Sequence, residues 1–458
     1  MSGKLQPYPA YKASGTAWCG QVPTHWSCLP HRALFTEVKD QGHPDEAMLS
    51  VTISQGVIRQ ADLLADSSKK DSSNLDKAKY KLVEPGDIAY NKMRAWQGAV
   101  GVSRYRGIVS PAYIVVRPRS NANPEYVHFL LRTPGFAKEA ERWSYGITSD
   151  MWSLRPEHFK MIYTCLPSRE EQDAIVRYLR VVDTKVNCFI RNRRRLIEVL
   201  NEQKQAIINR AVTRGLHSDV SLKPSGIDWL GDVPKHWDVA PLRWYVRIGS
   251  GEFLSGDLIR SEISCTHPHP VVGGNGVMGY TSAWNTDGTS LVIGRVGALC
   301  GNVHIIEGQS WITDNALRLA RVRRFRLDYL ALQLAAMNLN RLANASAQPL
   351  ITGAMVKSQA AVLPPESEQV KIVEFVREAT VALQTERNRA GREVALIREY
   401  RTRLVADVVT GKLDVRHLAP ATLDEMPIAQ HDDVDDGVND MPEAEGPDLV
   451  EETIDGET

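Results

Sequence analysis

The chain has 458 residues, of which 43% are hydrophobic and 24% charged, as in an ordinary folded protein. It has no run of 18 apolar residues, and its first residues lack the apolar core of a signal peptide, so we expect a cytoplasmic protein without a membrane partner. Of the 55 acidic side chains, 14 lie in residues 421–458, where Lys and Arg are absent. The rest of the chain holds 55 basic against 41 acidic side chains, which favours polyanionic partners.

The acidic end and the cysteines each support a simple expectation. Residues 417–458 are acidic and poor in aromatic residues, so they are predicted to form a disordered tail, with a solubilising role favoured over competition for basic surface. The six cysteines include no C-x-x-C pair and are predicted to be reduced thiols.

Two segments of the chain occur twice. Trp18–Trp26 returns as Trp229–Trp237 after 211 residues, and Leu166–Gln172 returns as Leu363–Gln369 after 197 residues. A period near 200 residues is far longer than the roughly 20–50 residues of solenoid repeats. The pattern therefore predicts two copies of a whole domain related by a pseudo-twofold axis. Such a molecule suits a target with two separated half-sites.

Each copy begins with a segment of mixed α/β character. Short apolar runs at 113–116 and 291–293 predict strands, and helices are expected from about Asn123 and Leu327. The Asn-Pro-Glu-Tyr run at 123–126 is similar to the Asn-Pro-Pro-Tyr/Phe motif of adenine methyltransferases. Glu125 replaces its second proline, however, and an N-cap asparagine followed by proline at the first helical position is the favoured interpretation.

Two polar loops in each copy are candidates for binding nucleic acid. Asn91–Gly98 matches Gly294–Gly301 at an offset of 203, and Trp143–Ser149 is aligned with Gln348–Gly353 so that Ile147-Thr148 faces Ile351-Thr352 at 204. Their side chains have donors and acceptors for phosphates and base edges. A solvated hairpin tip is the alternative, and repetition favours the functional interpretation. A glycine loop at 271–276, more simply a turn, adds one candidate. The candidate DNA-binding residues are Asn91, Lys92, Arg94, Trp96, Gln97, Ser144, Tyr145, Thr148, Ser149, Asn275, Arg295, Gln348 and Thr352.

Each copy ends in a long helix with coiled-coil periodicity. Ser168–Glu171 has the pattern of a capping box, and apolar residues then recur with alternating steps of four and three. About 44 residues at about 1.5 Å each give roughly 65 Å. We expect the two helices to pair antiparallel, with Glu386 and Glu393 facing solvent. The predicted pairing or subunit-docking residues are Ile175, Leu179, Val182, Val186, Phe189, Leu196, Leu200, Ile372, Val376, Leu383, Ile397 and Leu404.

Motifs for catalysis are missing from the sequence. It has no G-x-x-x-x-G-K-[ST] phosphate loop, and His267-Pro268-His269 lacks ligand partners at metal spacing. We therefore predict no catalytic residue, no metal site and no cofactor in this chain.

With its doubled motifs in order, the chain resembles the specificity subunit of Type I restriction–modification systems. The residues that carry the resemblance are Trp229–Trp237, its echo at Trp18–Trp26, and Leu363–Gln369 at the start of a long helix; it covers about residues 18–416. The chain departs from the pattern at Cys19, where leucine is usual.

The resemblance implies two target recognition domains that each recognise half of a bipartite, asymmetric DNA site, separated by two helices that act as a spacer. It also implies docking of two methyltransferase subunits, which would carry S-adenosylmethionine and methylate adenine, and of restriction subunits, which would use ATP and Mg²⁺. The chain itself would be non-catalytic. The domain boundaries expected are 1–165 for the N-terminal segment and first recognition domain, 166–216 for the central helix, 217–238 for a linker, 239–363 for the second recognition domain, 364–416 for the distal helix and 417–458 for the tail.

Other functions remain open from the residues alone. A stand-alone bipartite DNA-binding protein would need no catalytic partner and would bind specific DNA tightly by itself. A coiled-coil scaffold without a DNA role is disfavoured by the basic body and the doubled polar loops. An enzyme with a site assembled from distant residues would turn over substrate as an isolated chain.

Overall fold

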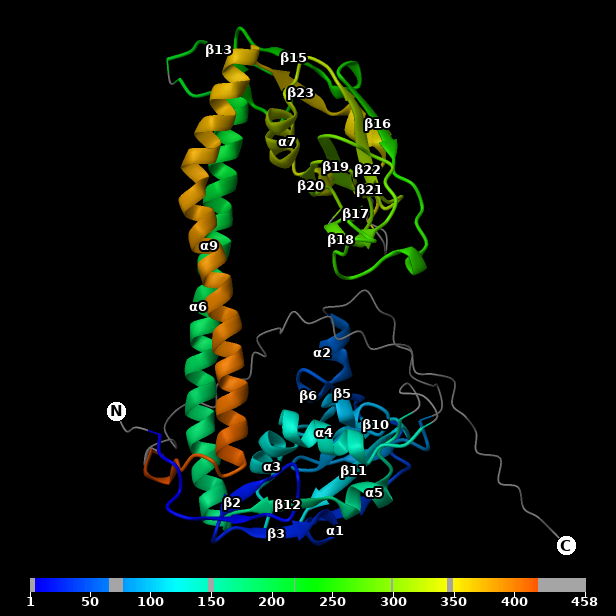
Figure 1. Cartoon of the computed structure of the whole chain (residues 1–458), viewed down its shortest axis with the longest axis vertical. Coiled ribbons are helices and arrows are strands. Elements are labelled where there is room, and N and C mark those ends of the chain that lie inside the picture. Colours follow the sequence, from blue (N-terminus) through cyan, green and yellow to red (C-terminus); the bar gives the residue numbers. More distant parts are fainter. Residues whose placement is uncertain are drawn as a thin grey trace, which may run out of the picture. The chain divides into compact units, whose positions relative to one another are not determined.

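The computed structural model describes residues 5–65, 77–146, 152–217, 219–297, 300–343 and 349–418. Its contacts divide the chain into two compact units, Met1–Arg193 with Arg392–Thr458, and Arg194–Gly391. Each unit holds one mixed α/β segment and part of the two long helices, α6 (Arg169–Arg214) and α9 (Glu366–Val409), as Figure 1 shows. The predicted mixed α/β fold with two long helices is confirmed. The predicted tail at 417–458 lies outside the described residues from 419 onward.

The first unit is organised around a four-stranded antiparallel sheet. The strand order is β4 (Phe35–Val38), β11 (Tyr113–Pro118), β8 (Ile88–Asn91) and β9 (Val100–Val102). The apolar run predicted at 113–116 lies in the central strand β11, where valine side chains are buried on both faces. Helix α3 (Pro124–Leu131) buries Tyr126 and its neighbours in the same core.

Smaller elements complete this unit. They include the ladders β1–β2, β5–β6, β7–β10 and β3–β12. The bounds are β1 Tyr11–Ala13, β2 Gln21–Pro23, β3 Ser27–Pro30, α1 His31–Leu34, β5 Leu49–Thr52, β6 Gly56–Arg59, α2 Gln60–Ala65, β7 Lys81–Val83, η1 Ala95–Gln97, β10 Gly107–Val109, α4 Pro134–Arg142, α5 Pro156–Met161 and β12 Tyr163–Leu166.

The second unit repeats this topology. Its antiparallel sheet has the order β16 (Val246–Ser250), β22 (Ala316–Val322), β19 (Ser290–Gly294) and β20 (Val303–Ile306). This unit also has a three-stranded sheet of β18, β17 and β21, whose strands alternate along the chain with those of the four-stranded sheet. It has no three-stranded counterpart among the described residues of the first unit. The other bounds are β13 Leu222–Pro224, β14 Asp232–Pro234, β15 Asp238–Pro241, η3 Leu242–Trp244, η4 Gly256–Leu258, β17 His269–Gly273, β18 Gly276–Thr281, β21 Trp311–Ile312, α7 Leu327–Ala336, η5 Leu339–Leu342, α8 Gly353–Ser358, β23 Ala360–Leu363 and η6 Arg416–Leu418, the last in the first unit.

Strand registers show that the repeat is structural. Tyr113 faces Asn91 in the first sheet, and Ala316 faces Gly294 in the second. Each residue of the first pair is therefore 203 residues before its counterpart in the second pair, as the sequence offset predicts. Within the stretch predicted to link the two copies, β13 and β14 pair antiparallel. Among the described residues, none of the helices has the length and apolar character needed to cross a bilayer.

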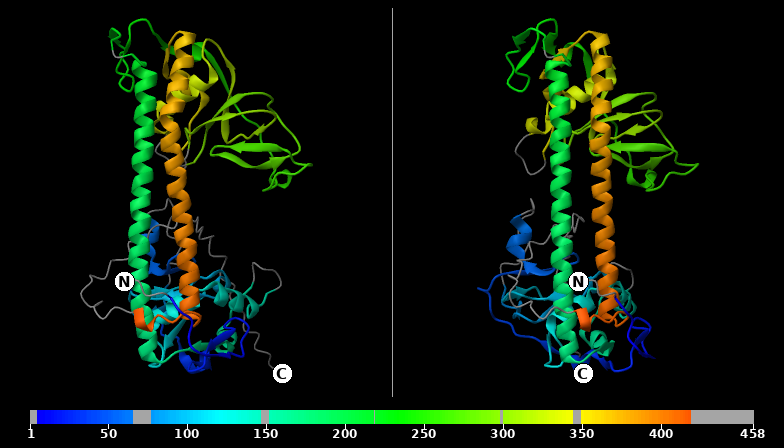
Figure 2. Two further views of the ribbon diagram at one scale, coloured as in Figure 1. Left: turned by 60° about the vertical axis from the view of Figure 1, so that its left-hand side comes forward. Right: turned by 90° about the vertical axis from the view of Figure 1, so that its left-hand side faces the viewer.

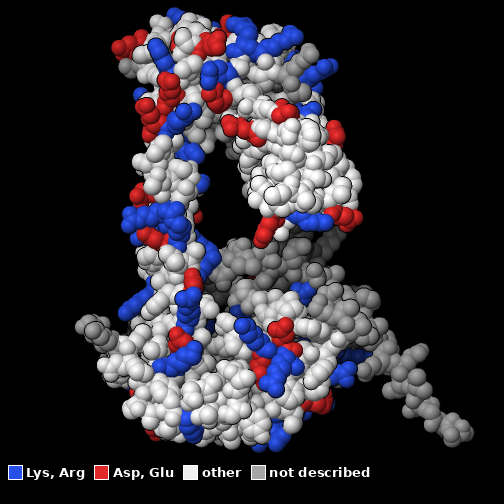
Figure 3. All heavy atoms as spheres, viewed as in Figure 1, with Lys and Arg blue, Asp and Glu red and all other residues white. Residues whose placement is uncertain are grey.

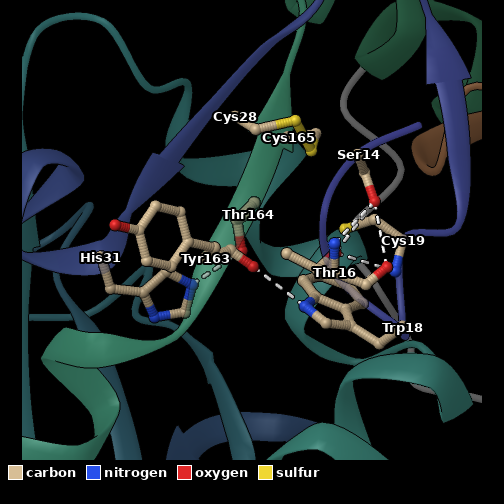
Figure 4. Close-up of a disulfide and its surroundings, with 9 residues drawn as sticks. All are labelled: Ser14, Thr16, Trp18, Cys19, Cys28, His31, Tyr163, Thr164 and Cys165. Atoms are coloured by element: carbon tan, nitrogen blue, oxygen red, sulfur yellow. Dashed lines mark hydrogen bonds between the residues drawn. A yellow bond between two sulfur atoms is a disulfide. The ribbon is translucent and has the colours of Figure 1, made fainter. Parts of the chain in front are cut away.

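A disulfide joins the two strands that frame the first α/β segment. Cys28 on β3 lies opposite Cys165 on β12, and the two sulfur atoms are bonded, as Figure 4 shows. The expectation of six free thiols is therefore wrong for this pair, because sequence spacing could not place residues 137 apart on facing strands. Closing so long a loop stabilises a fold by about 2–4 kcal/mol. The second unit has Val239 opposite Val362 in the same register.

The repeated opening motif buries one tryptophan in each unit. Trp26 and Trp237 are 1% and 0% exposed. Each ring meets a glycine just beyond the end of a long helix: a Cβ on Gly411 would lie 3.0 Å from Trp26, and one on Gly215 would lie 3.1 Å from Trp237. Both glycines also have a positive φ, near 78° and 74°, so glycine is required there by conformation and by space.

Helices α6 and α9 run antiparallel, as predicted. Within the first unit, Asp183 pairs with Arg401 at 2.8 Å and Arg193 pairs with Glu393 at 2.8 Å. Within the second unit, Lys204 donates to Gln384 at 3.2 Å. Residue numbers that rise along one helix fall along the other, and Figure 2 shows the two helices side by side in both views.

The facing positions differ in part from the predicted seam. Asp183 and Ile190 are buried, although the predicted seam used the residue just before each of them, Val182 and Phe189. On α9, Tyr400 is 51% exposed, and the next residue, Arg401, reaches across to α6. At Asp183 an ion pair with Arg401 takes the place of an apolar contact between the helices. Glu393, expected to face solvent, meets Arg193.

Two predicted helix starts have different outcomes. Asn123 caps α3, where its side chain accepts from the amides of Glu125 and Tyr126, so the N-cap interpretation is confirmed. At the start of α6, the Glu171 amide meets the Ser168 hydroxyl at 3.4 Å, but the Glu171 side chain does not turn back toward Ser168. Its carboxylate binds residues of the opening motif instead. The predicted capping box is therefore only half formed.

Candidate nucleic-acid interface

In the second unit, the two predicted loops lie side by side. The Ile351 amide donates to the Arg295 carbonyl at 2.9 Å, and the Gly297 amide donates to the Pro349 carbonyl at 3.0 Å. Val296 and Leu350 form a bridge between these contacts. The end of β19 and the start of α8 are thereby joined, which brings the two polar loops into one surface.

A shallow pocket of about 240 Å³ opens at this junction. Ser250, Arg295, Thr352 and Lys357 supply its polar lining. The Arg295 guanidinium donates to the Ser250 hydroxyl at 3.0 Å and to the Asp314 carbonyl at 3.3 Å, which holds the side chain in place. Its Nε has no hydrogen-bond partner within the described part of the chain. Two cations at one pocket favour an anionic ligand.

Thr352 has a structural duty at this pocket. It is the N-cap of α8, where its hydroxyl accepts from the Met355 amide at 3.3 Å. The hydroxyl proton remains available to donate, because capping uses only an acceptor position. Lys357 lies one turn further along the same short helix.

The first unit builds the corresponding surface from Lys92. Its carbonyl accepts from the Leu154 amide at 2.8 Å, in the way that Arg295 accepts from Ile351. The alignment of Ile147-Thr148 with Ile351-Thr352 is therefore wrong, because Leu154-Arg155 occupies the equivalent place ahead of α5. The offset of 197 already holds there, and the first copy carries extra residues before it. Arg155 is exposed at the N-cap of α5.

Two lysines pair with one carboxylate in the first unit, and two more lie within electrostatic range of this group. Lys160 pairs with Glu37 at 2.7 Å and Lys39 pairs with it at 3.6 Å. Burial disfavours ionisation of Glu37, but these two ammonium groups outweigh burial and lower the pKa of its carboxyl. Burial lowers the pKa of Lys81, and the charges of Lys92 and Lys39 lower it further against the opposing effect of Glu37. The cluster keeps a net positive charge.

Other candidates in the first loop shape the loop itself. The Asn91 side chain accepts from the Met93 amide at 2.9 Å. Trp96 donates to the Met93 carbonyl at 2.9 Å and packs edge-on against Trp152 at 5.5 Å. Gln97 is exposed and Arg94 is half-buried.

The remaining predicted residues are dispersed. Ser144 is buried and its hydroxyl donates to the Ala140 carbonyl at 2.7 Å, whereas Tyr145 is 58% exposed and packs against His158. Asn275 is exposed in the turn between β17 and β18. Thr148, Ser149 and Gln348 lie outside the described residues.

Sequence reasoning missed the lysines that complete both surfaces. Lys160 and Lys357 are 197 residues apart, so the constant offset of the helical ends would have found them had it been extended backwards. Lys39, Lys81 and Ser250 come from neighbouring strands and lack such a signal.

The predicted helix-face residues lie along the α6–α9 pair. Ile175, Leu179, Val186, Ile372, Val376 and Leu404 are buried. The others are half-buried: Val182, Phe189, Leu196, Leu200, Leu383 and Ile397. Figure 3 shows Lys and Arg interspersed with Asp and Glu over these helices. Within the described ranges, three or more His, Cys, Asp or Glu side chains nowhere gather as a metal site would require.

Comparison with known proteins supports the same assignment. Residues 258–390 match the model of the Type I restriction modification DNA specificity domain. The chain is 33% identical over 127 residues to the EcoprrI specificity subunit of Escherichia coli, with 28% of this chain and 32% of that subunit covered. The chain is related to Type I specificity subunits. It is also 24% identical over 290 residues to a putative specificity subunit, MjaX, of Methanocaldococcus jannaschii, with 55% of this chain and 63% of that protein covered.

The extent of these similarities differs. The chain spans less than two thirds of either curated specificity subunit. A solved structure from work on complex assembly and conformational transition of the type I restriction–modification system matches with a TM-score of 0.57 and 15% identity. That match covers 86% of this chain and 99% of the other, and it shows a shared fold.

Proposed function

We propose that the chain is the DNA-specificity subunit of a Type I restriction–modification complex. Each α/β segment recognises one half of a bipartite, asymmetric DNA site, and the helices α6 and α9 act as the spacer and as the docking surface for two methyltransferase subunits. Those subunits carry S-adenosylmethionine for adenine methylation. Restriction subunits add cleavage that uses ATP and Mg²⁺. The chain itself is non-catalytic and works in the cytoplasm, in defence against foreign DNA.

The observation that carries this proposal is the doubled cationic surface. Lys92 directly follows β8 as Arg295 directly follows β19, and Lys160 lies on α5 as Lys357 lies on α8. Phosphate contacts from such cations position a protein on a duplex, and a nearby arginine can recognise guanine through two hydrogen bonds. The specificity-domain match at 258–390 contains Arg295 and Lys357, which supports the placement of the second surface.

Alanine substitutions in these surfaces test the proposal. We expect Arg295→Ala to weaken specific DNA binding by about 1–3 kcal/mol, and Lys92→Ala to lower the salt dependence of binding by about one phosphate contact. The measurement is a DNA titration of the chain in complex with its methyltransferase subunits at several salt concentrations. Lys12→Ala is the control, because Lys12 is exposed on β1 and belongs neither to the proposed surfaces nor to α6 or α9. Unchanged affinity and salt dependence in both variants would contradict the proposed surfaces.

A further inference from the structure

One carboxylate in the first turn of α6 collects three side chains from the N-terminal part of the chain. Glu171 meets His25 at 2.8 Å, accepts from the Trp26 indole at 3.1 Å, and accepts from the Tyr8 hydroxyl at 2.7 Å. Its side chain is 5% exposed. Burial raises the pKa of the Tyr8 phenol, and the hydrogen bond to Glu171 and the charge of that carboxylate raise it further.

The first turn of α9 repeats this arrangement. Glu368 meets His236 at 2.8 Å and accepts from the Trp237 indole at 2.9 Å. Its side chain is 33% exposed. In both units, the His-Trp pair that ends the opening motif thus binds the glutamate of the repeated Glu-Gln pair.

The neighbouring glutamine fastens the other side of each helix start. Gln172 donates to the carbonyls of Asn121 and Pro167 and accepts from the Asn123 amide at 2.7 Å. The segment between β11 and α3 is thereby held against α6.

Gln369 makes the same three contacts in the second unit. It donates to the carbonyls of Arg324 and Pro364 at 3.0 Å each and accepts from the Arg326 amide at 2.8 Å. In both units, the first turn of a long helix is therefore bound on two sides. Its glutamate binds side chains of the opening motif, and its glutamine binds backbone groups of the segment that precedes α3 or α7.

We propose that Glu171 and Glu368 are positioning residues. Each fixes the orientation of its α/β segment relative to the first turn of the long helix that follows that segment. This inference rests on the proposed function, because the consequence is a fixed placement of each recognition surface on DNA. The glutamates touch no DNA. They act through the opening motif, and their loss broadens the spacing that the complex accepts without changing the bases that it prefers.

Glutamine in place of either glutamate isolates this effect. A carboxylate offers only acceptors, whereas glutamine of nearly equal size offers one acceptor oxygen and an amide that donates. The indole of Trp26 or Trp237 can only donate, so the glutamine oxygen must face it and the amide must face the histidine. That histidine nitrogen then has to accept instead of donate, and the negative charge that it meets in the wild type is lost. We expect Glu171→Gln to have the larger effect, because Glu171 is more buried and has a third partner.

The experiment uses the full chain in complex with its methyltransferase subunits. Synthetic duplexes carry the wild-type half-sites with the natural spacer, or with a spacer one base pair shorter or longer, and initial methylation rates are compared. We expect the rate ratio between natural and altered spacers to fall at least about fivefold in Glu171→Gln and by a smaller factor in Glu368→Gln. Glu170→Gln and Glu366→Gln are matched controls, because both glutamates are exposed residues of the same first turns. Both variants should keep the wild-type ratio.

The possible results separate the inference from the function on which it rests. Equal rate losses on all spacers would mean a merely structural role and would overturn the inference, as would unchanged ratios. If Glu171→Gln does not fold, Glu368→Gln decides, since its partly exposed site tolerates the change better. A wild-type complex that methylates bipartite DNA with no preference for one spacer would overturn the proposed function itself.

Discussion

Exchanging residues 239–362 for the matching segment of a related subunit is expected to change one half of the recognised DNA sequence and to leave the other half unchanged. The reason lies in the strand pairing, because Val239 and Val362 face each other on β15 and β23. Both junctions of the graft therefore fall at one place in the fold. The graft contains the core residues of the second segment, and the α9 residues against which that core packs remain those of the host chain.

The reciprocal graft provides the control for this exchange. Cys28 and Cys165 hold the equivalent positions on β3 and β12, so exchange of residues 28–165 should change the other half of the site. Mapping of methylated adenines after each exchange measures both outcomes. A change in both halves, or in the same half for the two grafts, would contradict independent recognition by the two segments.

Trp26→Ala is expected to destabilise the first unit by about 3–5 kcal/mol, the usual result of truncating a large buried aromatic side chain. Trp26 is 1% exposed and packs beneath Gly411, and its indole is one of the donors to buried Glu171. Truncation leaves a cavity and removes a hydrogen bond from a charged group, and both effects have the same sign.

Denaturant unfolding of the variants measures this loss of stability. Trp237→Ala should have a comparable effect on the second unit, because Trp237 is 0% exposed. Trp244→Ala is the matched control, since Trp244 is 66% exposed and its loss should change stability by less than about 0.5 kcal/mol. A small effect of Trp26→Ala would mean that the repeated motif does not stabilise its unit.

Much of the fold could be predicted because the repeat supplies two views of each element. The strand at 113–116 and the start of α3 at Asn123 follow from local patterns, and the antiparallel pairing of the long helices follows from the repeat. The pairing of Cys28 with Cys165 could not be predicted, because the second copy has valines at those positions.

The helix seam and the candidate surfaces show the physical limits of pattern reasoning. A seam built from apolar periodicity missed Asp183 and Arg401, since a charged residue enters such an interface only when its partner is known. In the same way, Lys92 and Arg295 stand out as repeated loop cations, but Lys39 and Lys81 join the surface only through strand pairing. The purpose of Glu171 was hidden for another reason: its partners lie about 145 residues away.

In the proposed function, the two units recognise one DNA site in two parts. Mapping methylated adenines in a genome with and without this gene, in the presence of its methyltransferase subunits, tests it most directly. We expect one bipartite motif whose two unlike halves are separated by a constant gap and whose methylation disappears with the gene. A methylation pattern that is unchanged without the gene, or a single contiguous motif, would contradict it.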